Sequence, residues 1–136
     1  PFCISALRVS GRPLVGIPDI VYKNRNTGEV RIVEIKGSGR DIPLDGWPNL
    51  RVQLWCYAQI DEWIKAPKIT LIGQVWGPVD NHLSLRKTLF WEKGVEPFEI
   101  VIIRDIIKIQ SDLKHIAYKL GVEIVVHQKE SISEVI

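Results

Sequence analysis

Two carboxylates and a lysine, Asp19, Glu34 and Lys36, fall in segments typical of neighbouring β-strands. Residues paired across a hairpin approach to about 5 Å, so Asp19 and Glu34 would be close enough to repel each other. A hard divalent cation such as Mg²⁺ or Mn²⁺, which prefers oxygen ligands, would relieve that repulsion. Because side chains two residues apart on a strand share one face, Lys36 would lie beside Glu34. The pattern predicts a metal site with an adjacent lysine.

Such a site is suited to hydrolysis of a phosphodiester, an anion that resists attack by a neutral water. A bound metal lowers the pKa of a water ligand and neutralises charge on the phosphate. A lysine beside it can position that water or stabilise the developing negative charge. The backbone carbonyl of Ile35 offers one more oxygen to the metal, while the Ile35 side chain is expected to point into the core.

Further polar residues follow in the sequence. Gln53 and Tyr57 are four residues apart in a predicted helix, so they share a face, outside the apolar stripe. Both are expected to face the site and to hydrogen-bond a phosphate or the lysine. Arg40 and Arg51 are candidate phosphate contacts, and Trp47 is a candidate stacking partner for a base. For these three, plain surface positions and packing against the helix start are the alternatives.

The elements that must position these residues follow from residue type and periodicity. The first half predicts strands, a hairpin turn at 24–29 and a helix with Asn49 as its N-cap. The strands are expected at 3–9, 15–23 and 30–36, the helix over 50–64, and a strand buried on both faces at 68–76.

The second half predicts less regular structure around one amphipathic helix over 105–120, ended by Gly121. Strands are expected at 83–91, 98–103 and 122–126. Strands that alternate with helices in this order indicate an α/β fold with a mixed central sheet flanked by helices.

Three short motifs together resemble the PD-(D/E)xK nuclease superfamily: Gly16-Ile17-Pro18-Asp19, then Glu34-Ile35-Lys36, then Gln53 with Tyr57. The helical QxxxY pair is similar to that of the RecB-like branch, and the resemblance covers residues 15–60. It implies a restriction-endonuclease-like core, with residues 1–136 as a single domain. It also implies metal binding by Asp19, Glu34 and the Ile35 carbonyl, a catalytic Lys36, and supporting roles for Gln53 and Tyr57.

The chain departs from this family at its start. The family usually begins with a helix that carries an acidic residue or a histidine and completes the metal site. Residues 1–15 predict no such helix. The site is therefore expected to be incomplete, or to be completed by a preceding segment or by another subunit.

The residues favour a Mg²⁺- or Mn²⁺-dependent nuclease. The resemblance further implies that it is a deoxyribonuclease acting on DNA in repair, recombination or defence. One alternative is a non-cleaving nucleic-acid-binding module on the same fold, within a larger complex or a homo-oligomer. Another is a purely structural domain. The presence of all three residues Asp19, Glu34 and Lys36 favours the nuclease.

Composition limits the number of domains, the kinds of cysteine site and the cellular location that this chain is expected to have. The 136 residues suffice for one core, and a net charge of +2 predicts no broad basic surface. Cys3 and Cys56 form no CxxC pair, so they indicate neither a zinc nor an iron–sulfur site. They are expected to be buried, reduced thiols, with a Cys3–Cys56 disulfide as the alternative. The sequence has no signal peptide and no membrane-spanning apolar run, so a cytoplasmic location without a membrane partner is expected.

Overall fold

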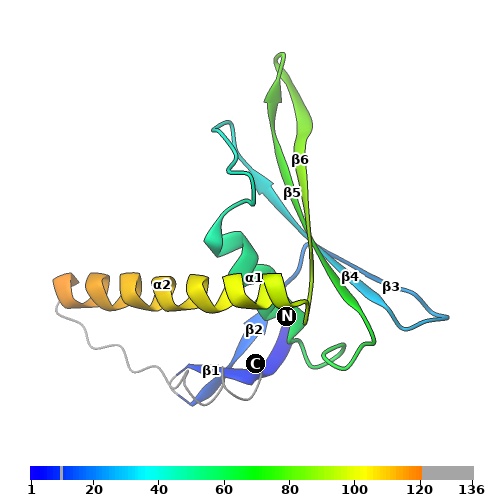
Figure 1. Ribbon diagram of the computed structural model, residues 1–136, viewed down its shortest axis with the longest axis vertical. Helices are drawn as coiled ribbons and strands as arrows, with labels where there is room; N and C mark the ends of the chain where they lie inside the picture. Colours follow the sequence, from blue (N-terminus) through cyan, green and yellow to red (C-terminus); the bar gives the residue numbers. More distant parts are fainter. Residues whose placement is uncertain (10, 121–136) are drawn as a thin grey trace.

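The computed structural model describes residues 1–9 and 11–120 of the chain. This part has a mixed α/β fold with a mixed four-stranded sheet, a separate two-stranded sheet and two helices (Figure 1). The α/β class with a mixed sheet is therefore confirmed. The elements are β1 (Phe2–Val9), β2 (Arg12–Gly16), β3 (Ile20–Lys23), β4 (Val30–Gly37), α1 (Pro48–Ala58), β5 (Ile69–Val79), β6 (His82–Glu92) and α2 (Glu96–Leu120).

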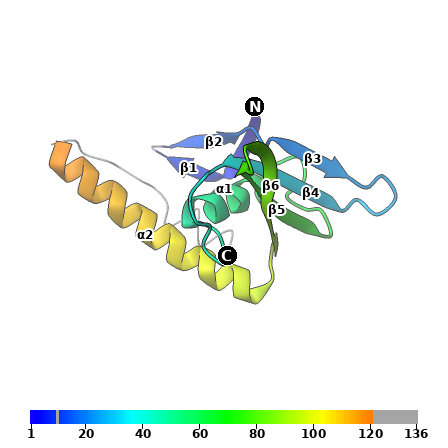
Figure 2. The ribbon, with the colours of Figure 1, turned by 90° about the horizontal axis from the view of Figure 1, so that it is seen from above.

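The four-stranded sheet has the order β3-β4-β5-β6. β4 pairs with β3 in antiparallel fashion and with β5 in parallel fashion, and β6 returns antiparallel to β5. A parallel pair needs a long crossover connection, and α1 with its flanking loops supplies it. α1 packs on β4 and β5, and α2 packs against α1 on the side away from the sheet (Figures 1 and 2).

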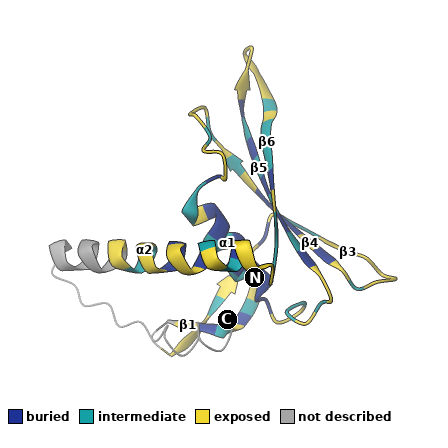
Figure 3. Cartoon of the chain, in the orientation of Figure 1, coloured by how far each residue is buried: buried dark blue, intermediate teal, exposed yellow. Residues whose placement is uncertain are grey.

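The core lies where α1 meets the sheet, β1 and α2 (Figure 3). Alternate residues of β4 and β5 face α1, as a strand with one covered face requires. The largest buried side chains are apolar and come from all of these elements: Ile4, Ile32, Leu50, Leu54, Trp55, Leu71 and Ile102. β5 alternates between buried and half-buried residues, so the prediction of a strand buried on both faces was wrong.

The strand predicted over 15–23 is two strands in the structure. β2 pairs with β1, whereas β3 pairs with β4, and Ile17–Asp19 joins the two sheets. Pro18 lacks the N–H that a continuous ladder would need and restricts the residue before it. The break therefore falls within the Gly16–Asp19 motif.

The helix predicted over 50–64 is shorter and begins earlier. α1 spans Pro48–Ala58, with Pro48 in its first turn, where a missing N–H is tolerated. Its N-cap is Trp47, without a side-chain cap hydrogen bond, so the assignment of Asn49 as N-cap was wrong. Ile60 remains fully buried beyond the helix end, which explains why the apolar pattern extended the prediction.

The strand predicted over 98–103 is the first part of α2. Pro97 fits the first turn of a helix, and Phe98, Ile102 and Ile106 are buried at a spacing of four residues. The β-branched residues between them produced the strand prediction, and packing against α1 overrides that preference. The strand predicted at 122–126 and Gly121 lie outside the described residues.

The remaining predictions on composition have clear outcomes. Cys3 and Cys56 are free thiols, as expected, but both are half-buried and not fully buried. In the described part of the chain, no helix is long and apolar enough to cross a membrane.

A buried ion pair links α1 to α2. The Arg51 guanidinium donates to Asp105 through Nε (2.7 Å) and Nη2 (3.1 Å), and both residues are buried. Removal of one partner leaves the other charge buried and uncompensated.

We expect Asp105→Ala to lower the free energy of unfolding by about 3–5 kcal/mol, because Arg51 would lose its counter-ion. Asp112→Ala removes an exposed carboxylate from the same helix and should change stability by about 0.5 kcal/mol or less. Urea denaturation followed by circular dichroism measures both. Equal stability of the two variants would show that the ion pair does not hold α2 in place.

Candidate active site

The two predicted carboxylates meet at the end of the β3–β4 hairpin. The last β3 pair is Ile20 with Val33, and one further step in the same register places Asp19 opposite Glu34. The two carboxylates are in hydrogen-bonding contact. Asp19 is also fixed by the backbone, because its Oδ2 accepts from the Ile35 N–H at 2.7 Å.

Burial and proximity shift the pKa values of the two carboxyl groups in opposite directions. Glu34 is only 4% exposed, and burial, together with the adjacent Asp19, raises the pKa of its carboxyl to about 7. The hydrogen bond with Glu34 lowers the pKa of Asp19, with help from the Ile35 N–H and the Lys36 charge. Near neutral pH the pair can hold one proton between them, and a divalent cation could replace that proton.

Lys36 and Glu34 occupy the same face of β4, the face that α1 covers. The Lys36 charge lowers the pKa of both carboxyls. The Ile35 side chain points to the opposite face of the sheet and is 42% exposed, so the expectation that it enters the core was wrong. That face carries no helix in the described part of the chain (Figure 2).

The geometry of β4 also offers the Ile35 carbonyl as an oxygen ligand. In a strand, the N–H and C=O of one residue point to the same side. The Ile35 N–H points to Asp19, beyond the last residue of β3. Its carbonyl therefore faces the same short edge, next to both carboxylates.

Gln53 and Tyr57 approach this site from α1, although not as expected. Gln53 Nε2 donates to Tyr57 Oη at 2.9 Å, and Tyr57 Oη donates to the Ile17 carbonyl at 3.3 Å. The hydroxyl is near Glu34 and helps to lower its pKa, whereas burial raises the pKa of Tyr57 to about 12. Tyr57 belongs to the buried core, so its placement outside the apolar face was wrong.

Tyr57 also explains the glycine of the motif. A Cβ at Gly16 would lie 2.9 Å from the Tyr57 ring, so only glycine lets the chain pass this close. Together, the ring contact and the hydrogen bond to Ile17 hold the 16–19 segment against α1. Tyr57 thus positions Asp19 indirectly.

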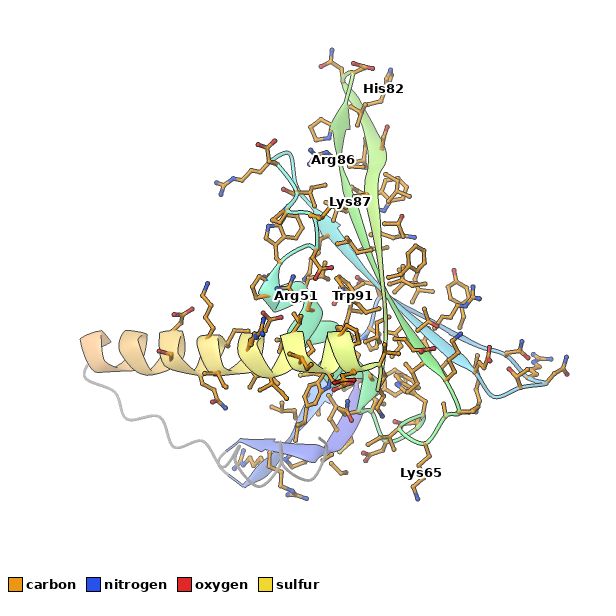
Figure 4. The ribbon with its side chains drawn as sticks, in the orientation of Figure 1. Arg51, Lys65, His82, Arg86, Lys87 and Trp91 are labelled. Carbon is orange, nitrogen blue, oxygen red and sulfur yellow. The ribbon has the colours of Figure 1, made fainter. Side chains whose placement is uncertain are left out.

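Arg51 is not available to a substrate. Besides its ion pair with Asp105, its Nη1 donates to the Asp45 carbonyl at 2.7 Å, and the residue is 8% exposed. Figure 4 shows Arg51 between α1 and α2. The prediction of a phosphate contact at Arg51 was wrong, and the spacing of Arg51, Trp55 and Ala58 on one helix face could have indicated its burial.

Arg40 and Trp47 lie near Lys36. They line a surface hollow of about 330 Å³ at the carboxyl end of β4, in which Arg40 is exposed and Trp47 half-buried. The other lining residues are Gly37, Ser38, Asp41, Asn49 and Leu50. The structure thus brings three of the predicted residues together.

Sequence reasoning missed two cations on β6 that hold residues 38–47, here called the tethered loop. Arg86 Nη1 donates to the carbonyls of Ser38 and Arg40, both at 2.7 Å. Lys87 Nζ donates to the Leu44 carbonyl at 2.8 Å and to that of Pro43 at 3.3 Å. Figure 4 shows both cations on the side of β6 toward this loop. Their partners are more than forty residues away, so no local spacing could have found them.

The oxygen donors of the site suit Mg²⁺ or Mn²⁺. The described residues contain no group of three or more His, Cys, Asp or Glu side chains around one point. Mg²⁺ is commonly bound through one or two carboxylates and keeps several waters. Asp19, Glu34 and the Ile35 carbonyl fit that mode of binding.

Comparisons with protein-family models, with curated proteins and with solved structures find no match to this chain. The chemistry of the described residues is therefore the basis for its proposed function.

We expect Gly16→Ala to destabilise the protein by about 1–3 kcal/mol, because the new methyl would overlap the Tyr57 ring. Gly37→Ala is the matched control, since a Cβ there meets nothing within 4 Å. Thermal unfolding by calorimetry compares the two variants. A Gly16→Ala protein as stable as the Gly37→Ala protein would show that the ring contact is not tight.

Proposed function

We propose that this chain is a metal-dependent deoxyribonuclease that hydrolyses phosphodiester bonds. The observation that carries the proposal is the contact between Asp19 and the buried Glu34, with Lys36 on the same face of β4. Two carboxylates this close are costly unless a proton or a cation lies between them. A domain with a purely structural role would not be stabilised by a buried acid next to a second acid.

Each residue has a physical role in this proposal. Asp19, Glu34 and the Ile35 carbonyl would hold Mg²⁺ or Mn²⁺, which supplies a water of lowered pKa and neutralises phosphate charge. The Lys36 ammonium can orient the attacking water or stabilise negative charge that develops on the phosphate. Tyr57 and Gln53 keep Asp19 in place through the 16–19 segment.

The arrangement of elements supports a restriction-endonuclease-like core as part of this proposal. The acids lie on the β3–β4 hairpin, and α1 connects β4 to the parallel strand β5. Residues 1–9 and 11–16 form the β1–β2 sheet and no helix. A further metal ligand would therefore come from elsewhere, such as a second copy of the chain or a larger complex.

DNA as the substrate, and repair, recombination or defence as the setting, follow from the resemblance of the three motifs. The cytoplasmic location likewise stays a prediction from the sequence. The free thiols of Cys3 and Cys56 are consistent with a reducing compartment.

We expect Mg²⁺ or Mn²⁺ to stabilise the wild-type protein, because the cation would offset the repulsion between Asp19 and Glu34. At ten times its Kd the gain would be about 1.4 kcal/mol, a rise of a few degrees in Tm. Differential scanning fluorimetry with each metal and with EDTA measures it. Glu34→Gln should lose the metal-dependent gain, whereas Glu62→Gln, an exposed control, should keep it.

The activity itself is tested with linear and circular DNA, single- and double-stranded, with Mg²⁺, Mn²⁺ or EDTA. We expect metal-dependent cleavage that Glu34→Ala and Lys36→Ala each reduce by about 100-fold or more. Lys65→Ala is the matched control, since Lys65 is exposed and far from the site (Figure 4). Binding of DNA without any cleavage would instead favour a non-cleaving nucleic-acid-binding module.

A further inference from the structure

The hollow beside Lys36 has rigid walls. Lys36 and Gly37 at the end of β4 form one side, and the tethered loop forms the other. The Arg86 and Lys87 bonds fix four carbonyls of that loop, and the Ser38 N–H donates to the Trp76 carbonyl at 2.8 Å. The shape of the hollow is therefore set before any ligand arrives.

A close packing contact also holds the base of the loop. A Cβ at Gly77 would overlap the Ser38 carbonyl oxygen and lie 2.8 Å from the Arg86 side chain. β5 and the loop thus approach each other as closely as glycine allows. A loop this firmly held is a poor candidate for a flap that opens to admit a thick ligand.

The groups that line the hollow are of mixed chemistry. Trp47 offers part of an aromatic surface, Asn49 is exposed and carries a side-chain amide, and Arg40 is an exposed cation. In the described part of the chain, the Arg40 side chain makes no hydrogen bond or ion pair, in contrast to Arg86. Asp41 also lines the hollow, and its charge would keep an anion on the side of Arg40 and Lys36.

This combination matches one nucleotide. A base has a flat face that stacks on an aromatic ring and an edge that an amide can bond, and its phosphate is an anion. A volume near 330 Å³ is at the small end of ligand sites. The hollow therefore has room for a single nucleotide but not for a DNA double helix. Inside a duplex both faces of a base are covered by its neighbours, so a base away from the duplex ends could stack on Trp47 only if it is unpaired.

We propose that this hollow is a subsite for one unpaired nucleotide, with its base on Trp47 and its phosphate at Arg40, and that the chain therefore engages single-stranded DNA. This inference rests on the proposed nuclease function and makes it more specific, because a nucleotide bound here would place its adjoining phosphodiester next to Lys36 and Glu34. Single-stranded ends, flaps or gaps would then be the preferred substrates.

Direct binding tests this subsite without any need for cleavage. Fluorescence anisotropy in EDTA compares a labelled single-stranded oligonucleotide, a blunt duplex of the same sequence, and the same strand with abasic sites. We expect the wild-type protein to bind the intact single strand most tightly. Equal binding of intact and abasic strands, or tighter binding of the duplex, would overturn the proposal.

Variants assign the binding to the named residues. We expect Trp47→Ala to weaken single-strand binding by about 10-fold, as loss of one base stack implies, and Trp47→Phe to retain most of it. Tyr22→Ala removes an exposed aromatic ring from the opposite face of the sheet and should have little effect. An unchanged Kd for Trp47→Ala, or an equal loss for Tyr22→Ala, would also overturn the subsite.

Arg40→Gln should weaken binding of all single strands and lower the slope of log K against log salt by about one. Arg25→Gln, which removes an exposed charge from the β3–β4 turn, should do neither. Circular dichroism of each variant checks that it is folded. If Trp47→Ala is unfolded, Trp47→Leu replaces it, because leucine keeps an apolar side chain against the core and removes the stacking ring.

The outcomes separate this inference from the nuclease proposal. Cleavage that needs Glu34 and Lys36, with no effect of Trp47→Ala on binding, would leave the nuclease and remove the subsite. Single-strand binding that depends on Trp47 and Arg40, without cleavage under any metal, would keep the subsite and remove the nuclease. No binding of any DNA would overturn the subsite.

Discussion

The parallel pairing of β4 with β5 is the constraint on which the rest of the structure depends. Parallel neighbours cannot be joined by a tight turn, so the chain must leave the end of β4, cross one face of the sheet and return. That path creates both the tethered loop and α1. It also puts α1 over the face of β4 that carries Glu34 and Lys36. The polar site and the apolar core therefore share one helix, and this explains why Tyr57 serves both.

Within that frame, the acidic pair depends on a break in a strand. Had the 15–23 segment continued as one strand, Asp19 would be an ordinary ladder residue with its neighbours paired on both sides. Pro18 ends that ladder, and the side chain of Asp19 takes over the backbone N–H of Ile35. The Asp19 carboxylate is thus hydrogen-bonded to β4, although Asp19 itself is not a strand residue. Because Asp19 is bonded to the main chain of β4, its carboxylate is kept beside Glu34.

Local pattern and chemistry were sufficient to predict the hairpin, the α1 region, β5, β6 and the proximity of Asp19, Glu34 and Lys36. Each depends on alternation, helical spacing or turn residues within a short window. What the sequence could not reveal depends on contacts far along the chain. Helical spacing could have indicated that Arg51 is buried, but it could not have identified Asp105 of α2, more than fifty residues away, as its partner. In the same way, the β-branched residues between Phe98 and Ile103 predict a strand, and only the packing against α1 accounts for the helix that forms there.

The β5–β6 hairpin has a consequence for the behaviour of the protein in concentrated solution. β6 is an outer strand of the sheet, eleven residues long, and Leu83 and Phe90 are 77% and 65% exposed. A long apolar sheet edge is a template for unwanted pairing between molecules. Arg86 is the extra residue where the β5–β6 register shifts, and Lys87 beside it turns inward to the loop. A bulge and inward-pointing charges interrupt a flat edge, so the cations that tether the loop also protect the protein against aggregation.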